Sequence, residues 1–95
     1  MTELDEHVVA PARLKLMTML TAVSEAEFAT VRDALDVSDS VLSKHLSALG
    51  DVDYVKRRKG MHRGRRTTWI SLTPRGRKAL SEHVSALREL INGIE

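Results

Sequence analysis

Seven basic side chains crowd into one short stretch of this sequence. Residues 54–66 contain no Asp or Glu, and their Lys and Arg residues are Lys56, Arg57, Arg58, Lys59, Arg63, Arg65 and Arg66. Like charges at this density repel one another unless a polyanion neutralises them. The stretch therefore predicts an electrostatic contact with a polyanion such as nucleic acid, rather than a merely solvated loop.

A milder polar surface precedes the basic stretch. Leu42, Leu46 and Leu49 fall within about 60° of one another on a helix of 3.6 residues per turn, so they form a buried stripe. Short polar side chains and one lysine share the other side, which lets such a helix lie deep in the major groove of duplex DNA. Their hydroxyl and ammonium groups can contact base edges or phosphates. The predicted DNA contacts of this helix are Ser38, Ser40, Ser43, Lys44 and Ser47.

Catalytic and metal-binding chemistry has little support in the residues. The chain has no cysteine, which excludes thiolate metal sites, disulfides and thiol catalysis. Its four histidines are scattered, and none pairs with another at metal-ligand spacing. We find no glycine-rich phosphate loop and no nucleophile motif. The sequence predicts neither an enzyme nor a cofactor or metal site.

The candidate DNA-binding helix needs a partner helix to hold it. Thr30 is the predicted N-cap of a short helix, and Asp33 completes a pair that is like a capping box. Ser38 is the predicted N-cap of the next helix, which we expect to close at Gly50. Two short helices joined by a turn of about three residues have the spacing of a helix-turn-helix.

The remaining elements surround this unit. A first helix begins at Pro11, where the missing N–H costs nothing, while residues 25–29 fit either a strand or a helix. The β-rich residues on either side of a glycine-bounded loop, residues 60–66, predict a hairpin. Thr73 and Pro74 start a final helix.

The hairpin supplies the second group of predicted DNA contacts. Successive strand residues point to opposite faces, so Lys56 and Arg58 share one face while Arg57 and Lys59 share the other. Arginines in the loop can approach a DNA backbone or a narrow minor groove. Trp69 is expected to be a packing residue rather than a base-stacking one. The predicted contacts of the hairpin are Lys56, Arg58, Arg63, Arg65 and Arg66.

Helix, helix-turn-helix and basic hairpin follow one another in the order of a winged helix. The segment "VSDSVLSKHLSALGDVDYVKRRKG", followed by "TTWISLTPRGRKAL", resembles small winged-helix transcriptional regulators of the MarR and ArsR type. The closest match is their compact branch, with a single winged helix and one terminal helix, and it covers roughly residues 10–90. The resemblance implies a homodimeric DNA-binding repressor or activator, and it does not say whether an inducer exists.

Length and charge are consistent with one such domain. The 95 residues, 42% of them hydrophobic, suit a single domain, and the net charge is −6 over residues 1–53 but +8 over residues 54–95. We expect a mainly α (α+β) winged helix-turn-helix with its helix-turn-helix at about 30–49, a two-stranded wing at about 54–73 and a dimerisation helix at about 74–92. No apolar run is long enough to span a membrane and the N-terminus is acidic, so a cytoplasmic protein is expected.

The last helix predicts how two chains assemble. Its apolar residues recur at spacings of four, three, four and three, which is the seam of packed helices: Leu80, Val84, Leu87, Ile91 and Ile94. The first two can instead cover the domain's own core. The last three lie beyond it and call for a partner chain, joined by residues near Leu4, Val8 and Leu14.

The sequence thus predicts a sequence-specific regulator of transcription that binds double-stranded DNA as a homodimer, with repression favoured. Two alternatives stay open: a winged helix that binds RNA or single strands, and one that serves as a protein-interaction module. The small number of aromatic residues argues against the first, because single-stranded bases usually stack on Tyr, Phe or Trp. A small-molecule effector is possible at a dimer interface, but no residue pattern indicates one.

Overall fold

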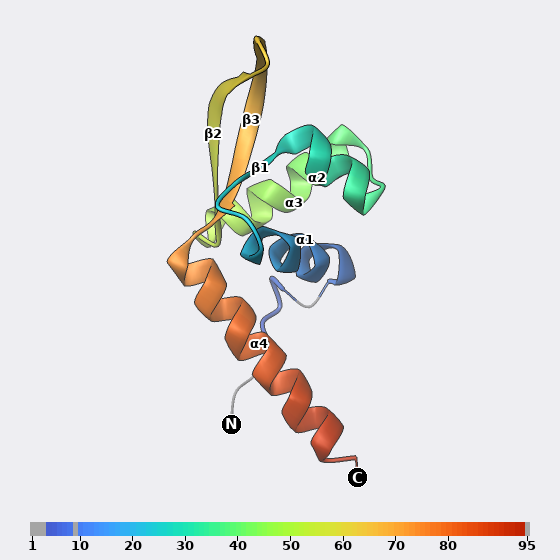
Figure 1. Cartoon of the computed structure of the whole chain (residues 1–95). Coiled ribbons are helices and arrows are strands. Elements are labelled where there is room, and N and C mark those ends of the chain that lie inside the picture. Colours follow the sequence, from blue (N-terminus) through green and yellow to red (C-terminus); the bar gives the residue numbers. More distant parts are fainter. Residues whose placement is uncertain (1–3, 9, 95) are drawn as a thin grey trace.

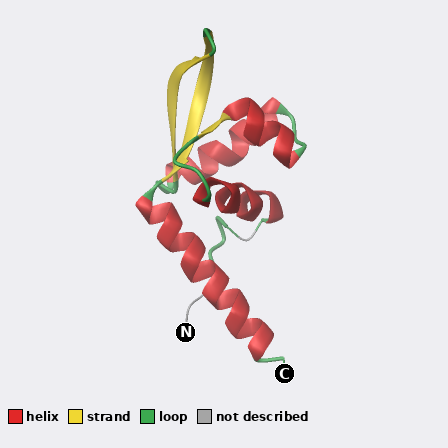
Figure 2. Ribbon diagram, viewed as in Figure 1, coloured by secondary structure: helices red, strands yellow, loops and turns green. Residues whose placement is uncertain are grey.

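Four helices and a three-stranded antiparallel sheet make up the part of the chain that the computed structural model describes, residues 4–8 and 10–94 (Figures 1 and 2). The elements are α1 (Pro11–Thr21), β1 (Ala26–Glu27), α2 (Phe28–Leu35), α3 (Asp39–Asp51), β2 (Val55–His62), β3 (Arg65–Leu72) and α4 (Pro74–Asn92). Helices α1, α2 and α3 lie beside the base of the hairpin, and α4 runs away from it (Figure 1). The molecule is elongated as a result, with extents of 53 × 25 × 22 Å.

The start of α2 differs from the sequence prediction. Thr30 is not the N-cap, because the helix already begins at Phe28 and Glu27 occupies the cap position without a side-chain cap bond. Residues 26 and 27 form the short strand β1, which pairs with β3 and leads straight into α2. Segment 25–29 therefore contains a strand and then the start of a helix. The pairing of β1 with β3 sets the start of α2, and a capping pattern among neighbouring residues does not reveal such a long-range contact.

The turn between α2 and α3 closes as the helix-turn-helix spacing predicts. Asp36 has a φ of 54°, and its N–H and that of Val37 bond back to the carbonyls of α2. Such a left-handed residue is a common way to end a helix. Ser38 then caps α3 by accepting a hydrogen bond from the Val41 N–H at 3.2 Å, which confirms its predicted role.

The end of α3 lies beyond Gly50. The helix continues to Asp51, and Asp53 (φ 60°) takes the left-handed position that usually holds glycine. The N–H groups of Asp53 and Tyr54 bond to the carbonyls of Gly50 and Leu49, at 3.0 and 2.8 Å, as in a Schellman motif. The predicted glycine C-cap is therefore wrong: an aspartate, which tolerates this conformation, ends the helix.

The strands of the hairpin are longer, and its turn is tighter, than predicted. Strands β2 and β3 pair from Val55 opposite Leu72 to His62 opposite Arg65, so residues 60–66 are not a loop. Only Arg63 (φ 51°) and Gly64 (φ 79°) form the turn, and two consecutive positive φ angles suit the right-handed twist of a hairpin. The sheet also gains β1 as a third strand, in the order β1-β3-β2.

One apolar core joins all of the helices to the sheet. It contains Leu16, Met17 and Leu20 of α1, Val31 of α2, the predicted leucine stripe of α3, Val55 and Ile70 of the sheet, and Leu80 of α4. Val8 is also in this core and is fully buried, so it is not available to a partner chain as the sequence had suggested. The core fixes the position of α3 against the base of the hairpin.

Candidate nucleic-acid interface

The polar side of α3 is open to solvent. Ser40, Lys44 and Ser47 are exposed, and Ser43 is half-buried where α3 approaches the hairpin. Ser38 lies at the start of the same helix, where its hydroxyl caps the backbone and lies 3.1 Å from the Ser40 hydroxyl. The structure therefore brings the five predicted residues of α3 together on one accessible side and at one end of the helix.

The opposite side of α3 is held in place by packing and by a polar contact with α2. Leu42, Leu46 and Leu49 are fully buried. At the N-terminus of α3, Asp39 accepts a hydrogen bond from the Arg32 guanidinium of α2 at 2.9 Å. This bond, followed by that to the neighbouring Asp33, raises the pKa of Arg32 above its ordinary value. Helix α3 is thus fixed as part of a rigid helix pair.

His45 attaches α3 to α1. It is half-buried beside the leucine stripe, and its Nδ1 accepts a hydrogen bond from the Nε of Arg13 at 3.2 Å. Burial, and then the positive charges of Arg13 and Lys44, lowers the pKa of His45 below its ordinary value. His45 therefore has a packed structural role between α3 and α1.

The hairpin has two faces with different surroundings. We call inner the face that carries Val55 and Ile70 and packs on the helices, and outer the opposite face. Directly paired residues of an antiparallel sheet share a face, so the inner face also carries Arg57, Lys59 and Arg66. The outer face carries Lys56, Arg58, His62, Arg65 and Trp69.

A hollow joins the inner face to α3. It is lined by Ser43 of α3, Phe28 of α2, and Arg57, Arg58, Lys59 and Thr68 of the hairpin. A second hollow, nearer the turn of the hairpin, has Lys59, Met61 and Arg66 in its lining. Two cations that the sequence prediction omitted, Arg57 and Lys59, therefore lie next to the polar side of α3.

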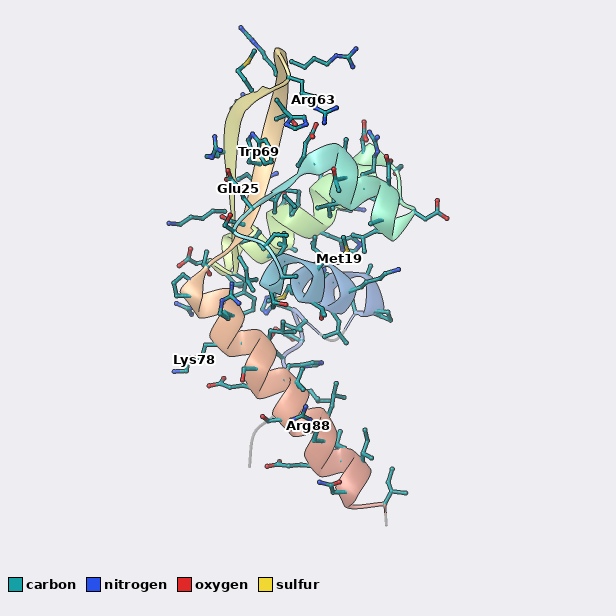
Figure 3. The ribbon with its side chains drawn as sticks, viewed as in Figure 1. Met19, Glu25, Arg63, Trp69, Lys78 and Arg88 are labelled. Atoms are coloured by element: carbon teal, nitrogen blue, oxygen red, sulfur yellow. The ribbon has the colours of Figure 1, made fainter. Side chains whose placement is uncertain are left out.

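The predicted hairpin residues fall into three places. Arg66 lies on the inner face, Arg63 is exposed in the turn at the tip (Figure 3), and Lys56, Arg58 and Arg65 lie on the outer face. Arg58 binds Glu25, and this contact lowers the pKa of the Glu25 carboxyl and raises that of the guanidinium. The structure does not bring these five residues together on one surface.

A polar network ties the N-terminal segment to the base of the hairpin and to α4. The Tyr54 hydroxyl donates to Asp5, and the Asp5 N–H donates to Nδ1 of His83 at 3.1 Å. The hydrogen bond to Asp5, and then burial, raises the pKa of Tyr54 to about 12. Burial alone would raise the pKa of Asp5, but hydrogen bonds from Tyr54 and His7 outweigh it and the pKa is lowered.

The far half of α4 leaves apolar side chains uncovered. Leu80 belongs to the core and Val84 packs against it, which is the alternative that the sequence left open for these two residues. Leu87 is half-buried, whereas Leu90 and Ile91 are 56% and 59% exposed, and Ile94, beyond the end of α4 at Asn92, is 84% exposed. Leu90 was not part of the predicted seam, and it adds to the uncovered apolar surface.

The described residues hold no group of three His, Cys, Asp or Glu side chains that could bind a metal ion. Among the described helices, none combines the length and the apolar character that crossing a bilayer would require.

Comparison with known proteins gives a family and a set of structural relatives. A family model described as a winged helix DNA-binding domain matches residues 12–91. The uncharacterized protein MJ0432 of Methanocaldococcus jannaschii is 29% identical over 83 residues, which are 87% of this chain and 90% of that protein.

Two solved structures show the same fold. A transcriptional regulator homologue of Pyrococcus horikoshii OT3 superposes with a TM-score of 0.88 at 25% identity, over 96% of this chain and 90% of that one. ZitR of Lactococcus lactis, a zinc-responsive MarR family member, superposes with a TM-score of 0.64 at 19% identity, over 90% of this chain and 58% of ZitR. At that identity the likeness to ZitR concerns the fold alone. The winged helix that the sequence predicted is confirmed, and its fold is shared with this MarR family member.

Proposed function

The chain belongs to the winged-helix DNA-binding domain family, and from this premise we propose that it binds specific sites in double-stranded DNA as a homodimer and thereby represses transcription. One observation carries the proposal: the short polar side of α3 and the cations of the inner hairpin face border the same hollow. A duplex phosphate backbone at this hollow would meet Arg57 and Lys59 while α3 lies in the adjacent major groove.

The two surfaces would divide the work. Hydroxyls of Ser40, Ser43 and Ser47 and the ammonium of Lys44 are short or flexible groups that reach base edges and nearby phosphates. The cations of the hairpin supply affinity that does not depend on sequence, through release of counterions from the DNA. The helix has no Arg, Asn or Gln, so DNA shape would contribute to site selection.

Double-stranded DNA fits the aromatic residues better than single strands do. The chain has one Trp, one Tyr and one Phe. Trp69 packs against Arg58 and His62, the Tyr54 hydroxyl binds Asp5, and Phe28 is half-buried against the core. Sites for single strands stack successive bases on free aromatic faces, and these three are already engaged.

A second copy of the chain is the proposed cover for the far half of α4. Leaving three apolar side chains in water forfeits roughly 1.5–3 kcal/mol each relative to burial. A two-fold dimer through Leu87, Leu90, Ile91 and Ile94 would set the two α3 helices to read half-sites about one DNA turn, roughly 34 Å, apart. A protein bound across such a site excludes other proteins from it, which is why we favour repression.

Binding to defined nucleic acids tests the function directly. Fluorescence anisotropy at physiological salt should give different affinities for different genomic duplex fragments. The preferred fragments should bind more tightly than single-stranded DNA or RNA of the same sequence. Equal affinity for all duplexes and for heparin would favour the protein-interaction alternative. Preference for single strands would favour the other one.

Light scattering tests the assembly. The pair Leu90→Glu and Ile91→Glu should give folded monomers with weakened duplex binding, because both side chains are exposed in one chain and their loss spares its core. Ser85→Glu adds one negative charge to another side of α4 and should leave the protein dimeric. A dimeric double variant would place the interface elsewhere.

A further inference from the structure

Three segments of the chain meet on the outer face of the hairpin. The Nε of Arg58, on β2, donates to Oε2 of Glu25 at 3.0 Å, and its Nη2 donates to Oε1 of the same carboxylate. The guanidinium carbon of Arg58 lies 5.7 Å from the ring centre of Trp69, on β3. We call Glu25, Arg58 and Trp69 the outer clamp; Figure 3 shows Glu25 and Trp69 at the junction of the hairpin with β1.

Neighbouring residues complete this arrangement. The His62 ring meets Trp69 edge-on with its centre 5.5 Å away, and its Nε2 lies 3.7 Å from Oε2 of Glu27. Gly60 provides the space: a Cβ at this position would lie 2.7 Å from Nη1 of Arg58 and 2.9 Å from Cδ1 of Trp69. Real Cβ atoms do not approach other atoms so closely, so a side chain at residue 60 would displace the outer clamp.

The outer clamp connects the hairpin to the helix-turn-helix. Glu25 directly precedes β1, whose last residue is the N-cap of α2. Helix α2 is in turn tied to the start of α3 by the bond between Arg32 and Asp39. The backbone ladder between β1 and β3 has only two residue pairs, Ala26 with Ile70 and Glu27 with Trp69. Side chains therefore supply much of the connection between the hairpin and the two helices.

We infer that the outer clamp is a positioning device that fixes the angle between the hairpin and α3, and that Arg58 serves DNA binding only through it. The inference rests on the proposed function, because the angle matters only if both surfaces bind one duplex. Beyond the clamp the hairpin extends free of the helices (Figure 1), so a small rotation at its base would carry the tip far from α3. Arg57 and Lys59 would then leave the DNA that Ser43 approaches.

The opposite possibility is that Arg58 itself binds a DNA phosphate and that Glu25 competes for it. The two models predict opposite effects of Glu25→Gln, which removes one acidic charge and leaves Arg58 in place. If Arg58 is a phosphate contact, the variant should bind duplex DNA more tightly. If the clamp positions the hairpin, the variant should bind about fivefold more weakly, because an exposed bidentate ion pair and a cation–π contact are each modest.

The experiment measures duplex affinity and its salt dependence for the full chain. Asp51→Asn removes one acidic charge from the exposed end of α3 and controls for charge alone. The exchange of Glu25→Arg with Arg58→Glu keeps the net charge and rebuilds the pair, so we expect it to restore affinity that Arg58→Glu alone loses. Arg58→Gln should weaken binding and leave the log–log salt slope unchanged, whereas a lost phosphate contact would flatten the slope by about 0.9.

A readout without DNA shows whether the clamp has opened. Trp69 is the only tryptophan, so its fluorescence reports on its contact with Arg58, and we expect Glu25→Gln to shift its emission while the helical circular dichroism stays unchanged. Wild-type protein that does not bind duplex DNA would refute the proposed function. Wild-type protein that binds, beside a Glu25→Gln variant that binds equally well or better, would refute the positioning role alone.

Discussion

Lys56 and Lys59 offer a matched test of which face of the hairpin meets DNA. They are the same residue type, three positions apart on β2, and both are exposed. Lys59 lies on the inner face and lines the hollow that it shares with Ser43, whereas Lys56 lies on the outer face. We expect Lys59→Gln to remove a phosphate contact and Lys56→Gln to remove none.

The salt dependence of binding gives the size of the effect. Each phosphate contact contributes about 0.9 to the slope of log affinity against log salt. Raising the salt from about 50 to about 200 mM weakens binding, and a protomer that lacks one phosphate contact should show a drop in affinity about 3.5-fold smaller than wild type. Fluorescence anisotropy titrations of one labelled duplex at several salt concentrations measure this, and Arg57→Gln should repeat the Lys59 result. Equal flattening in the Lys56 and Lys59 variants would refute the division between faces and would support the contact that the sequence predicted for Lys56.

Two predictions concern the scaffold. A Cβ on Gly76 would lie 2.1 Å from the Tyr54 carbonyl oxygen, so Gly76→Ala should destabilise the fold by about 1–3 kcal/mol. A Cβ on Gly50 would meet open space, so Gly50→Ala should stabilise the fold by about 0.5–1 kcal/mol. Urea unfolding measures both changes. Because the pKa of His45 is lowered from 6.5, the unfolded chain takes up that proton first, and stability should fall as the pH drops below 6.5. His45→Gln should flatten this pH dependence of the urea midpoint.

Signals that act within a few residues were read correctly from the sequence. Ser38 and Thr73 cap their helices through the hydrogen bonds that their hydroxyls accept, and Pro11 and Pro74 stand at the first helical positions. The leucine stripe of α3 is fully buried. Each of these features depends on neighbours within one or two helical turns, which is the range over which residue type and spacing are informative.

Most of the errors originate in contacts from elsewhere in the chain, whereas the end of α3 is set locally. Gly50 and Gly60 were taken as a helix end and a loop boundary, yet aspartate takes the left-handed position after α3, and Gly60 makes room for Trp69 within a strand. Thr30 lost the cap role because β1 pairs with β3. No spacing rule connects Glu25 with Arg58, which is 33 residues away.

The faces of the hairpin, by contrast, were within reach of the sequence. Alternation along a strand assigns Arg57 and Lys59 to the same face as the apolar residue Val55, which is buried. The sequence prediction used this alternation to separate the two pairs of cations, but it chose Lys56 and Arg58 without asking which pair shares a face with an apolar residue of the core. The sequence could not show that α3 lies next to this face, because Ser43 reaches the hollow only through the packing of α3.

The number of cations that face DNA sets a limit on the salt dependence of the whole protein. Arg58 is neutralised by Glu25, and Lys56 and Arg65 lie on the outer face, so only part of the basic stretch is placed to bind the backbone. The cations that remain on the inner face, at the tip and on α3 are Arg57, Lys59, Arg63, Arg66 and Lys44. At about 0.9 for each contact, a protomer can reach a slope of about 4.5 and a dimer about 9. A slope near the dimer value, halved in the monomeric Leu90→Glu and Ile91→Glu variant, would link the hairpin to the assembly through α4. A wild-type slope well above 9 would mean that cations outside this set also contact DNA.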